Sequence, residues 1–281
     1  MSDIVAIITP AYDAERWIGA CARSVLGQTY DYWEHIIVSD DGKNYEEMIA
    51  AQGVRDPRLK FLSSGTIGGG ASRARNVALE VSTAPYAAIL DADDRFKPDK
   101  LEQAIAALQH HPIVSVALDE FDENERPLRL VGAGPDRELS PANYKWTCLS
   151  MDSMILWDRR KTDARYDTTL TNMTDLELLL QLYRTAASSW HLGTPLHDYL
   201  KLSVSMSNGP GVTEKMIRSK REMLRRLETG FYQMADSSGP EGMAKFLRIS
   251  LLAEETYPAA VMAQPGLLFE DHIEPMLRAA A

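Results

Sequence analysis

The sequence predicts an α/β fold, in which a mostly parallel sheet is flanked by helices and followed by a helical extension. Three short apolar segments have the composition of buried strands, namely 4–8, 35–39 and 86–90, and each ends in a cluster of polar residues. Between them, apolar residues recur at helical spacing in 14–26 and 73–81. This alternation indicates parallel strands joined by right-handed crossovers, so we expect the polar clusters to meet at one edge of the sheet.

The rest of the chain mixes both kinds of element. Apolar periodicity predicts further helices at 98–109, 175–183, 213–228, 243–262 and 266–279. Strands are expected at 113–121, 127–131 and within 147–157, with the polar turn of a hairpin at 122–126 and loops at 132–141 and 203–211. We therefore expect one domain over residues 1–210, made of two halves (1–105 and 106–210), and the extension over 211–281.

Composition narrows the classes of protein. The chain of 281 residues is 45% hydrophobic, which is enough for a sizeable core. Its net charge of −10 argues against a nucleic-acid scaffold. Cys21 and Cys148 show no paired spacing, so we expect small core residues in a reducing compartment. Residues 1–3 lead directly into the first strand, and no apolar run approaches the ~20 residues of a membrane span. We expect no signal peptide and a cytoplasmic location.

The most informative cluster is acidic. Asp91, Asp93 and Asp94 directly follow the apolar strand at 86–90. Asp91 and Asp93 point to the same side of an extended chain, where two like charges repel unless a cation lies between them. Carboxylate oxygens are the ligands that Mg²⁺ and Mn²⁺ prefer, so the pattern predicts a metal site. The alternative is an acidic turn in which Asp94 caps the helix at 98–109.

The order of motifs resembles the family 2 glycosyltransferases, which have the nucleotide-diphospho-sugar (GT-A) fold. The strong matches are Thr9–Ala14, Ser24–Tyr30, Ile36–Gly42, Ala74–Asn76, Leu90–Asp94 and Pro98–Leu101, and the weaker ones are Thr174–Leu178 and Ser205–Ser207. The resemblance covers roughly the first 210 residues, and is strong over the first 105. It implies a nucleotide-sugar donor bound by residues 1–105, an acceptor bound by residues 106–210, and a divalent Mn²⁺ or Mg²⁺ ion.

The resemblance also assigns roles within the acidic cluster. It implies that Asp93 contacts the metal directly and that Asp91 lies near the ribose or the water shell of the metal. Asp91, Ala92, Asp93 and Asp94 are together expected to contact the nucleotide-sugar. For Asp94, a contact with a sugar hydroxyl and a helix cap stay open.

Other residues of the first half are expected to bind the nucleotide. Asp41 is the family's candidate for accepting the N3–H of uracil, although an Asp before Gly42 also suits a plain turn. Pro10, Ala11 and Tyr12 are expected to end the first strand in a bend facing the base, with Tyr12 packed on the base or in the core. Arg75, near a helix start, suits a diphosphate, and a solvated surface arginine is the alternative.

Asp175 is the candidate general base by resemblance. Transfer with inversion needs a carboxylate that takes the proton of the acceptor hydroxyl. The family usually carries a Glu–Asp pair here, whereas this chain has Thr174 before Asp175, and an acid in a first helical turn is also favourable through the helix dipole alone. Many relatives carry Arg and His where Leu200 and Leu202 stand, so their help with the diphosphate is absent or comes from elsewhere, Lys201 being the candidate.

These observations predict an inverting, metal-dependent glycosyltransferase that uses a UDP-sugar, with GDP- and dTDP-sugars left open. The expected acceptor is a hydroxyl of a saccharide or a lipid-linked glycan precursor. The alternative is a catalytically impaired member that binds nucleotide-sugar. A phosphoacceptor receiver domain is disfavoured, because its acidic pair should follow the first strand, where Pro10 and Ala11 stand. For the charge-rich helix at 213–228 we expect packing on the domain, while a peripheral membrane contact and a homodimer contact of the C-terminal helices stay open.

Overall fold

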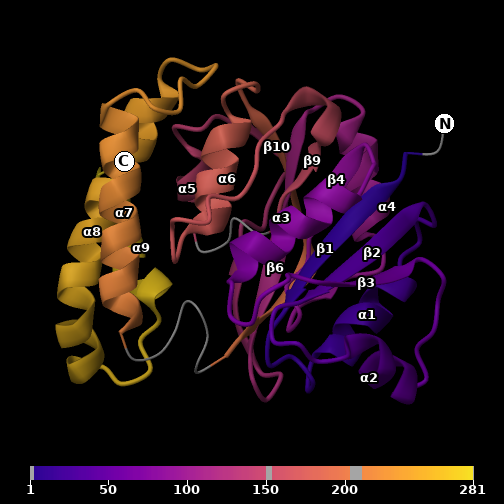
Figure 1. Ribbon diagram of the computed structural model, residues 1–281. Coiled ribbons are helices and arrows are strands. Elements are labelled where there is room, and N and C mark those ends of the chain that lie inside the picture. Colours follow the sequence, from indigo (N-terminus) through magenta and orange to yellow (C-terminus); the bar gives the residue numbers. More distant parts are fainter. Residues whose placement is uncertain (1–2, 150–153, 203–210, 281) are drawn as a thin grey trace.

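The computed structural model describes residues 3–149, 154–202 and 211–280. Within these residues, ten strands form one sheet, and Figure 1 shows helices packed around it and a separate helical layer at the C-terminal end. The main path of the sheet runs in the order β3-β2-β1-β4-β9-β6-β10-β5, with β7 beside β6 and β8 beside β10. The predicted α/β architecture is therefore confirmed.

The elements have the following bounds. The strands are β1 (Val5–Ala11), β2 (Trp33–Ser39), β3 (Leu59–Ser63), β4 (Tyr86–Ile89), β5 (Arg95–Phe96), β6 (Ile113–Asp122), β7 (Pro127–Val131), β8 (Arg137–Leu139), β9 (Leu156–Asp158) and β10 (Ser189–Lys201). The helices are α1 (Ile18–Leu26), α2 (Tyr45–Ala51), α3 (Ala71–Val81), α4 (Lys100–Leu108), α5 (Tyr144–Thr147), α6 (Thr174–Leu182), α7 (Val212–Glu228), α8 (Gly239–Ala263) and α9 (Phe269–Ala280), with a short 3-10 helix η1 (Arg159–Lys161).

The sheet is mostly parallel, as predicted. Strands β3, β2, β1 and β4 run parallel to one another, so their carboxyl ends share one edge. Strand β9 reverses the direction between β4 and β6, and β10 then runs parallel to β6. The short β5 pairs antiparallel with β10, which carries the chain after β4 directly onto β10.

The first strand is longer than predicted. It extends to Ala11 and pairs Pro10 with Val38 of β2. Proline is tolerated there because the ladder between β1 and β4 already stops at Ile8, so its missing N–H interrupts no bond on that side. The bend therefore comes at Tyr12, and α1 begins at Ile18 instead of residue 14.

Other local predictions were less complete. Helices α2 and α5 and strands β3, β5 and β10 were not predicted, and β8 lies inside the expected loop at 132–141. Of the strand expected within 147–157, β9 confirms the end, whereas the first residue, Thr147, belongs to α5. Residues 150–153 and most of the expected loop at 203–211 lie outside the described residues. The hairpin of β6 and β7 and the helices α4, α6, α7, α8 and α9 confirm their predictions.

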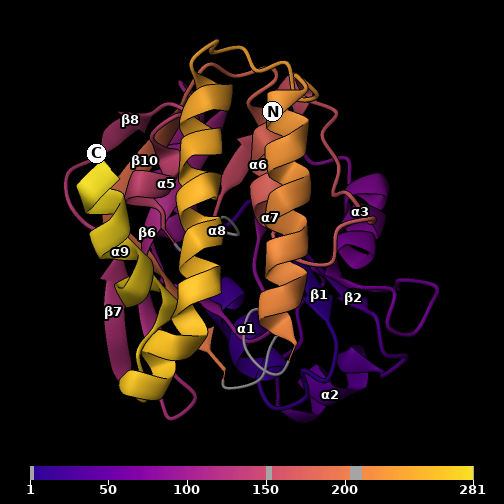
Figure 2. The ribbon, with the colours of Figure 1, turned by 90° about the vertical axis from the view of Figure 1, so that its left-hand side faces the viewer.

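The C-terminal extension forms a layer of its own. Figure 2 shows α7, α8 and α9 side by side on one face of the molecule, with α6 behind α7. The buried ion pair between Lys220 and Glu254 joins α7 to α8, and Lys201 of β10 pairs with Glu270 of α9. Among the described helices, none combines the length and the apolar character that crossing a bilayer requires.

Candidate functional site

A buried arginine connects the two halves of the predicted site. Arg75 lies on α3 with its side chain 4% exposed. Its Nη2 atom is 2.6 Å from Oδ1 of Asp91, and its Nη1 atom is 2.9 Å from Oδ1 of Asp175. Burial alone would lower the pKa of Arg75, but the charges of Asp175 and Asp91 raise it, so the guanidinium stays charged. The alternative of a solvated surface arginine is wrong, and the candidate base lies beside the acidic turn.

Tyr166 completes this contact and was not predicted. The Arg75 guanidinium lies 5.0 Å from the centroid of the Tyr166 ring, which is a cation–π geometry. Asn76, the neighbour of Arg75 on α3, donates to the Tyr166 carbonyl at 2.8 Å and accepts from its N–H at 2.9 Å. Tyr166 is thus fixed to α3 by its backbone. No sequence motif surrounds Tyr166. The only residue of this contact that the sequence analysis had noted besides Arg75 is Asn76, which belongs to the same motif, Ala74–Asn76.

The acidic turn follows β4 as predicted. Thr9 of β1 fixes its start by donating to the Leu90 carbonyl at 2.7 Å, and the Asp94 N–H donates to the Asp91 carbonyl at 3.0 Å. Burial, and after it the charge of Asp91, raise the pKa of Asp93 to about 7, while Arg75 offsets part of this. Two carboxylates whose negative charge Arg75 balances only in part fit a hard divalent cation. Asp93 and Asp91 are the residues that would hold it. Over residues 3–149, 154–202 and 211–280, no group of three or more His, Cys, Asp or Glu side chains gathers to hold a metal.

The carboxylate of Asp94 is buried and hydrogen-bonded to other groups of the protein. It is 1% exposed, its Oδ2 atom lies 2.9 Å from Nε2 of His197, and its Oδ1 atom accepts from the Leu200 N–H at 2.9 Å. The other ring nitrogen of His197 lies 2.8 Å from Nζ of Lys100, which is also fully buried. The interpretation of Asp94 as a cap of α4 is wrong, since its acceptors serve β10. The buried side chains of Asp94, His197 and Lys100 together fasten the acidic turn to β10.

Asp41 is already well provided with donors. It accepts from the Tyr45 hydroxyl at 2.7 Å, the Asp13 N–H at 2.8 Å, the Lys43 N–H at 3.0 Å and the Ser39 hydroxyl at 3.1 Å. Burial alone would raise the pKa of Asp41, but these hydrogen bonds outweigh it and lower the pKa to about 2. The turn alternative therefore describes its contacts in this structure, and its binding of a nucleobase stays a prediction.

The glycine-rich segment before α3 is held by Asp40. The N–H groups of Gly69 and Gly70 donate to the two Asp40 oxygens at 3.1 and 2.8 Å, and Ser64 donates to the same carboxylate at 2.6 Å. Gly70 has a φ of 93°, which permits the chain to turn directly into α3. This turn places Arg75 in the second turn of the helix, at the edge of the sheet.

The remaining predicted donor residues differ in exposure. Pro10 is half-buried, whereas Ala11 and Ala92 are buried. Tyr12 is 56% exposed, so the alternative that it belongs to the core is wrong. An exposed aromatic ring beside the carboxyl edge of the sheet is able to pack on a nucleobase.

The departures from the family pattern have structural partners. Leu200 is buried, and Lys201 pairs with Glu270 at 2.7 Å in the extension. Lys201 is therefore engaged with α9 in this structure instead of standing in for the missing Arg and His. Thr174, the first residue of α6, is 4% exposed.

Glu177 is a buried acid that the sequence analysis did not single out. It lies on α6, is fully buried, and its Oε2 atom accepts from Gln181 at 2.8 Å. Burial raises the pKa of Glu177 to about 7, and the Asp167 charge adds to this, whereas Gln181 and Arg226 act in the opposite direction. The buried side chain of Tyr232 lies close enough to Glu177, Asp167 and Arg226 for their charges to act on its hydroxyl.

This shift predicts a pH-dependent stability. Because the folded-state pKa of Glu177 lies above its ordinary value of 4.5, ionising it costs more in the folded protein. Its contribution to the free energy of unfolding should therefore fall as pH rises from about 4.5 to about 7. We expect the Tm of Glu177→Gln to gain on that of the wild type over this range, as measured by calorimetry. A Tm difference that does not change with pH would contradict the assignment.

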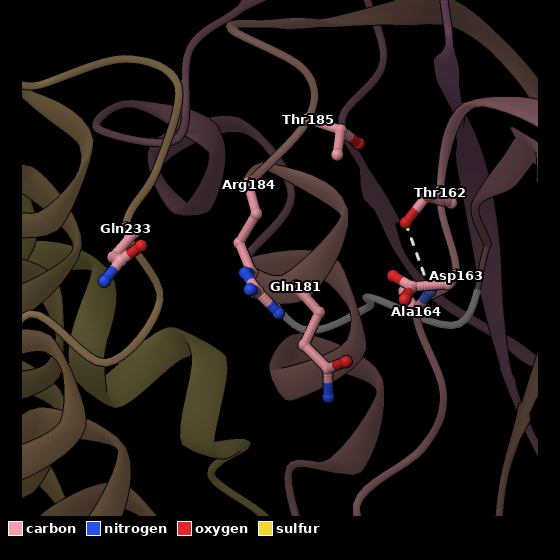
Figure 3. Close-up of a pocket in the computed structure, with 7 residues that line it drawn as sticks. All are labelled: Thr162, Asp163, Ala164, Gln181, Arg184, Thr185 and Gln233. Atoms are coloured by element: carbon pink, nitrogen blue, oxygen red, sulfur yellow. Dashed lines mark hydrogen bonds between the residues drawn. The ribbon is translucent and has the colours of Figure 1, made fainter.

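A polar hollow lies at the far end of α6 from Asp175. It has a volume of about 190 Å³, and Figure 3 shows that the segment 162–164, the end of α6 with the residues after it, and Gln233 surround it. Its lining residues are Thr162, Asp163, Ala164, Gln181, Arg184, Thr185 and Gln233. Gln181 both lines the hollow and donates a hydrogen bond to Glu177. The hollow therefore lies beside Glu177 and is separate from the acidic turn.

The comparison with protein families decides the identity. The family model described as "Glycosyl transferase family 2" matches residues 6–176. The chain belongs to this family. It is therefore a glycosyltransferase, and the predicted family and GT-A fold are confirmed.

Named relatives and solved structures agree with this assignment. The chain is 27% identical over 210 residues to the putative teichuronic acid biosynthesis glycosyltransferase TuaG of Bacillus subtilis, covering 73% of this chain and 82% of TuaG. It is 37% identical over 105 residues to the Escherichia coli enzyme WfgD, named UDP-Glc:alpha-D-GlcNAc-diphosphoundecaprenol beta-1,3-glucosyltransferase, which covers 37% of this chain and 41% of WfgD.

Solved structures share the fold. The Staphylococcus aureus protein TarS, residues 1–349 in complex with UDP-GlcNAc, superposes with a TM-score of 0.68 at 17% identity, covering 96% of this chain and 78% of that one. The mannosyltransferase PcManGT of Pyrobaculum calidifontis, solved with GDP-Man and Mn²⁺, gives a TM-score of 0.59 at 14% identity, covering 98% of this chain and 79% of that one.

Proposed function

We propose that this glycosyltransferase is metal-dependent and inverting, and moves a sugar from a UDP-sugar to a hydroxyl of a saccharide or lipid-linked glycan precursor. The observation that carries the proposal is the bridge through Arg75, which sets the candidate base Asp175 beside the acidic turn. A transferase needs these groups within one substrate's length of each other.

The choice of UDP rests on relatives. WfgD is named as using UDP-Glc, and TarS was solved with UDP-GlcNAc, whereas PcManGT was solved with GDP-Man. The names of TuaG and WfgD support an acceptor of the bacterial glycan type. We place the enzyme in the cytoplasm, where nucleotide-sugars are made, with a contact between the C-terminal helices and a membrane or a second copy left to experiment.

The chemistry follows from the residues. The acceptor hydroxyl attacks the anomeric carbon on the face opposite the diphosphate, and Asp175 takes the hydroxyl proton. A new C–O bond forms, and the bond to the diphosphate oxygen breaks with its electron pair leaving on the diphosphate. Arg75 carries a buried positive charge beside the acidic turn. Its Nε atom has no hydrogen-bond partner within the described residues, and this free donor suits the binding of an anion such as the diphosphate. Asp93 and Asp91 are the residues that would hold a divalent ion, which would supply further positive charge to balance the departing diphosphate.

Turnover with a panel of nucleotide-sugars tests the proposal. We expect release of UDP from a UDP-sugar in the presence of Mn²⁺ and a saccharide acceptor, loss of this activity in EDTA, and a product of inverted anomeric configuration by NMR. A retained configuration would contradict the role of Asp175. UDP binding without turnover on any donor would favour the impaired, binding-only alternative.

A further inference from the structure

An arginine side chain of the C-terminal extension contacts α6, the helix that carries Asp175. Arg226, in the last turn of α7, is 9% exposed. Its Nη1 atom lies 2.7 Å from Oδ2 of Asp167 and 3.4 Å from Oε1 of Glu177, and its Nε atom donates to Oε1 of Glu222 at 2.8 Å. Its guanidinium also lies 5.1 Å from the Phe231 ring centroid. Arg226 therefore joins α7 to two other segments of the chain.

Each of these two segments carries a residue of the candidate site. Glu177 stands two positions after Asp175 on α6 and is fully buried. Asp167 directly follows Tyr166, whose ring lies against Arg75, and Asp167 is itself fixed by the N–H and hydroxyl of Thr169 at 2.7 and 2.6 Å. Arg226 is thus tied to both segments that border the ion pair of Arg75 and Asp175.

We propose that Arg226 is a positioning residue for transfer, and that the extension thereby forms part of the acceptor side of the active site. The proposal rests on the proposed function of Asp175 as general base. Arg226 holds α6 and the segment at 166–167 at a fixed separation, so that the Asp175 carboxylate stays against Arg75. A small displacement of a catalytic group by a distant change is sufficient to cost about 10²-fold in rate.

The same helix provides a matched control. Lys220 lies six positions before Arg226, and its Nζ atom is 2.6 Å from Oε1 of Glu254, with both side chains almost fully buried. This pair joins α7 to α8 inside the extension. A purely structural role of Arg226 predicts that loss of either cation has the same kind of effect, whereas a positioning role predicts different effects.

The experiment compares Arg226→Met, Arg226→Lys and Lys220→Met with the wild type. We expect Arg226→Met to lower kcat by about 10²-fold per folded molecule, while KM for the UDP-sugar and Kd for UDP stay within about twofold. Arg226→Lys should recover part of kcat, since an ammonium keeps the charge but not the forked geometry. Lys220→Met should lower the Tm and leave kcat near that of the wild type.

Hydrogen exchange separates this proposal from the proposed function. Arg226→Met should speed amide exchange in α6 over residues 174–182 relative to Lys220→Met. Unchanged exchange in α6, or an equal loss of kcat in Arg226→Met and Lys220→Met, would overturn the positioning role. A parallel loss of UDP affinity in Arg226→Met would also overturn it. If exchange in α6 differs between the two variants as expected but the wild type transfers no sugar, the proposed function is refuted and not the contact between Arg226 and α6.

Discussion

Replacement of Asp175 by Asn should lower kcat by about 10²–10⁴-fold and leave the affinity for UDP near that of the wild type. The reason is that a general base is needed in the transition state, when the acceptor hydroxyl loses its proton, and not for binding of the donor. Asn keeps the size of the side chain but lacks the basic oxygen. The measurement is steady-state transfer with a UDP-sugar and Mn²⁺, beside a calorimetric titration with UDP.

The control for Asp175→Asn is Glu214→Gln. Glu214 is an exposed acid in the first turn of α7, so its substitution also removes a favourable interaction with a helix dipole. Glu214→Gln should keep full activity. If Asp175→Asn kept most of its rate, the base would lie elsewhere, and Asp175 would be a helix-start residue with an ion pair to Arg75.

Replacement of Arg75 by Met should have the second large effect. It leaves the carboxylates of Asp91 and Asp175 without their shared cation. Loss of one partner of a buried ion pair typically costs 3–5 kcal/mol, and because these carboxylates are 28% and 25% exposed we expect about 2–3 kcal/mol of unfolding free energy. We also expect a fall in kcat of about 10²–10³-fold, because a positive charge beside the diphosphate is removed.

A second arginine serves as the control for Arg75→Met. Arg159 donates to the carbonyls of Leu79, Ser82 and Ala84, so Arg159→Met should lower the Tm without a comparable loss of kcat per folded molecule. The double variant Arg75→Met/Asp91→Asn should recover part of the lost unfolding free energy, since one of the two unbalanced charges is gone. Equal effects of Arg75→Met and Arg159→Met on kcat would mean that Arg75 has only a structural role.

Local patterns of the sequence were sufficient for much of the fold. The apolar runs that became β1, β2 and β4 and the periodicity of α3 and α6 depend on neighbouring residues, which a single sequence shows. Strand β3 escaped prediction because it lies at the edge of the sheet and its exposure is mixed, so its composition does not mark it as buried. The two-residue β5 exists only through its pairing with β10.

The candidate site was predictable as a set of residues but not as a set of contacts. Nothing local to Arg75 indicates that it lies between Asp91 and Asp175, because these contacts join segments that only the folded chain brings together. For the same reason the sequence did not show that Asp94 faces His197 inside the protein. Glu177 and Arg226 resembled ordinary charged helix residues, and only their burial marks them as a link between α6 and the extension.

If Asp93 holds a metal on which donor binding depends, a calorimetric titration with UDP will reveal it without any need for turnover. The wild type should bind UDP at least about tenfold more tightly with Mn²⁺ than with EDTA, a difference of about 1.4 kcal/mol. Asp93→Asn should lose this difference and keep its Tm, whereas Asp99→Asn, at an exposed cap position without a side-chain hydrogen bond, should retain it. An Asp93→Asn protein whose affinity for UDP responds to Mn²⁺ as the wild type does would show that Asp93 does not hold this metal.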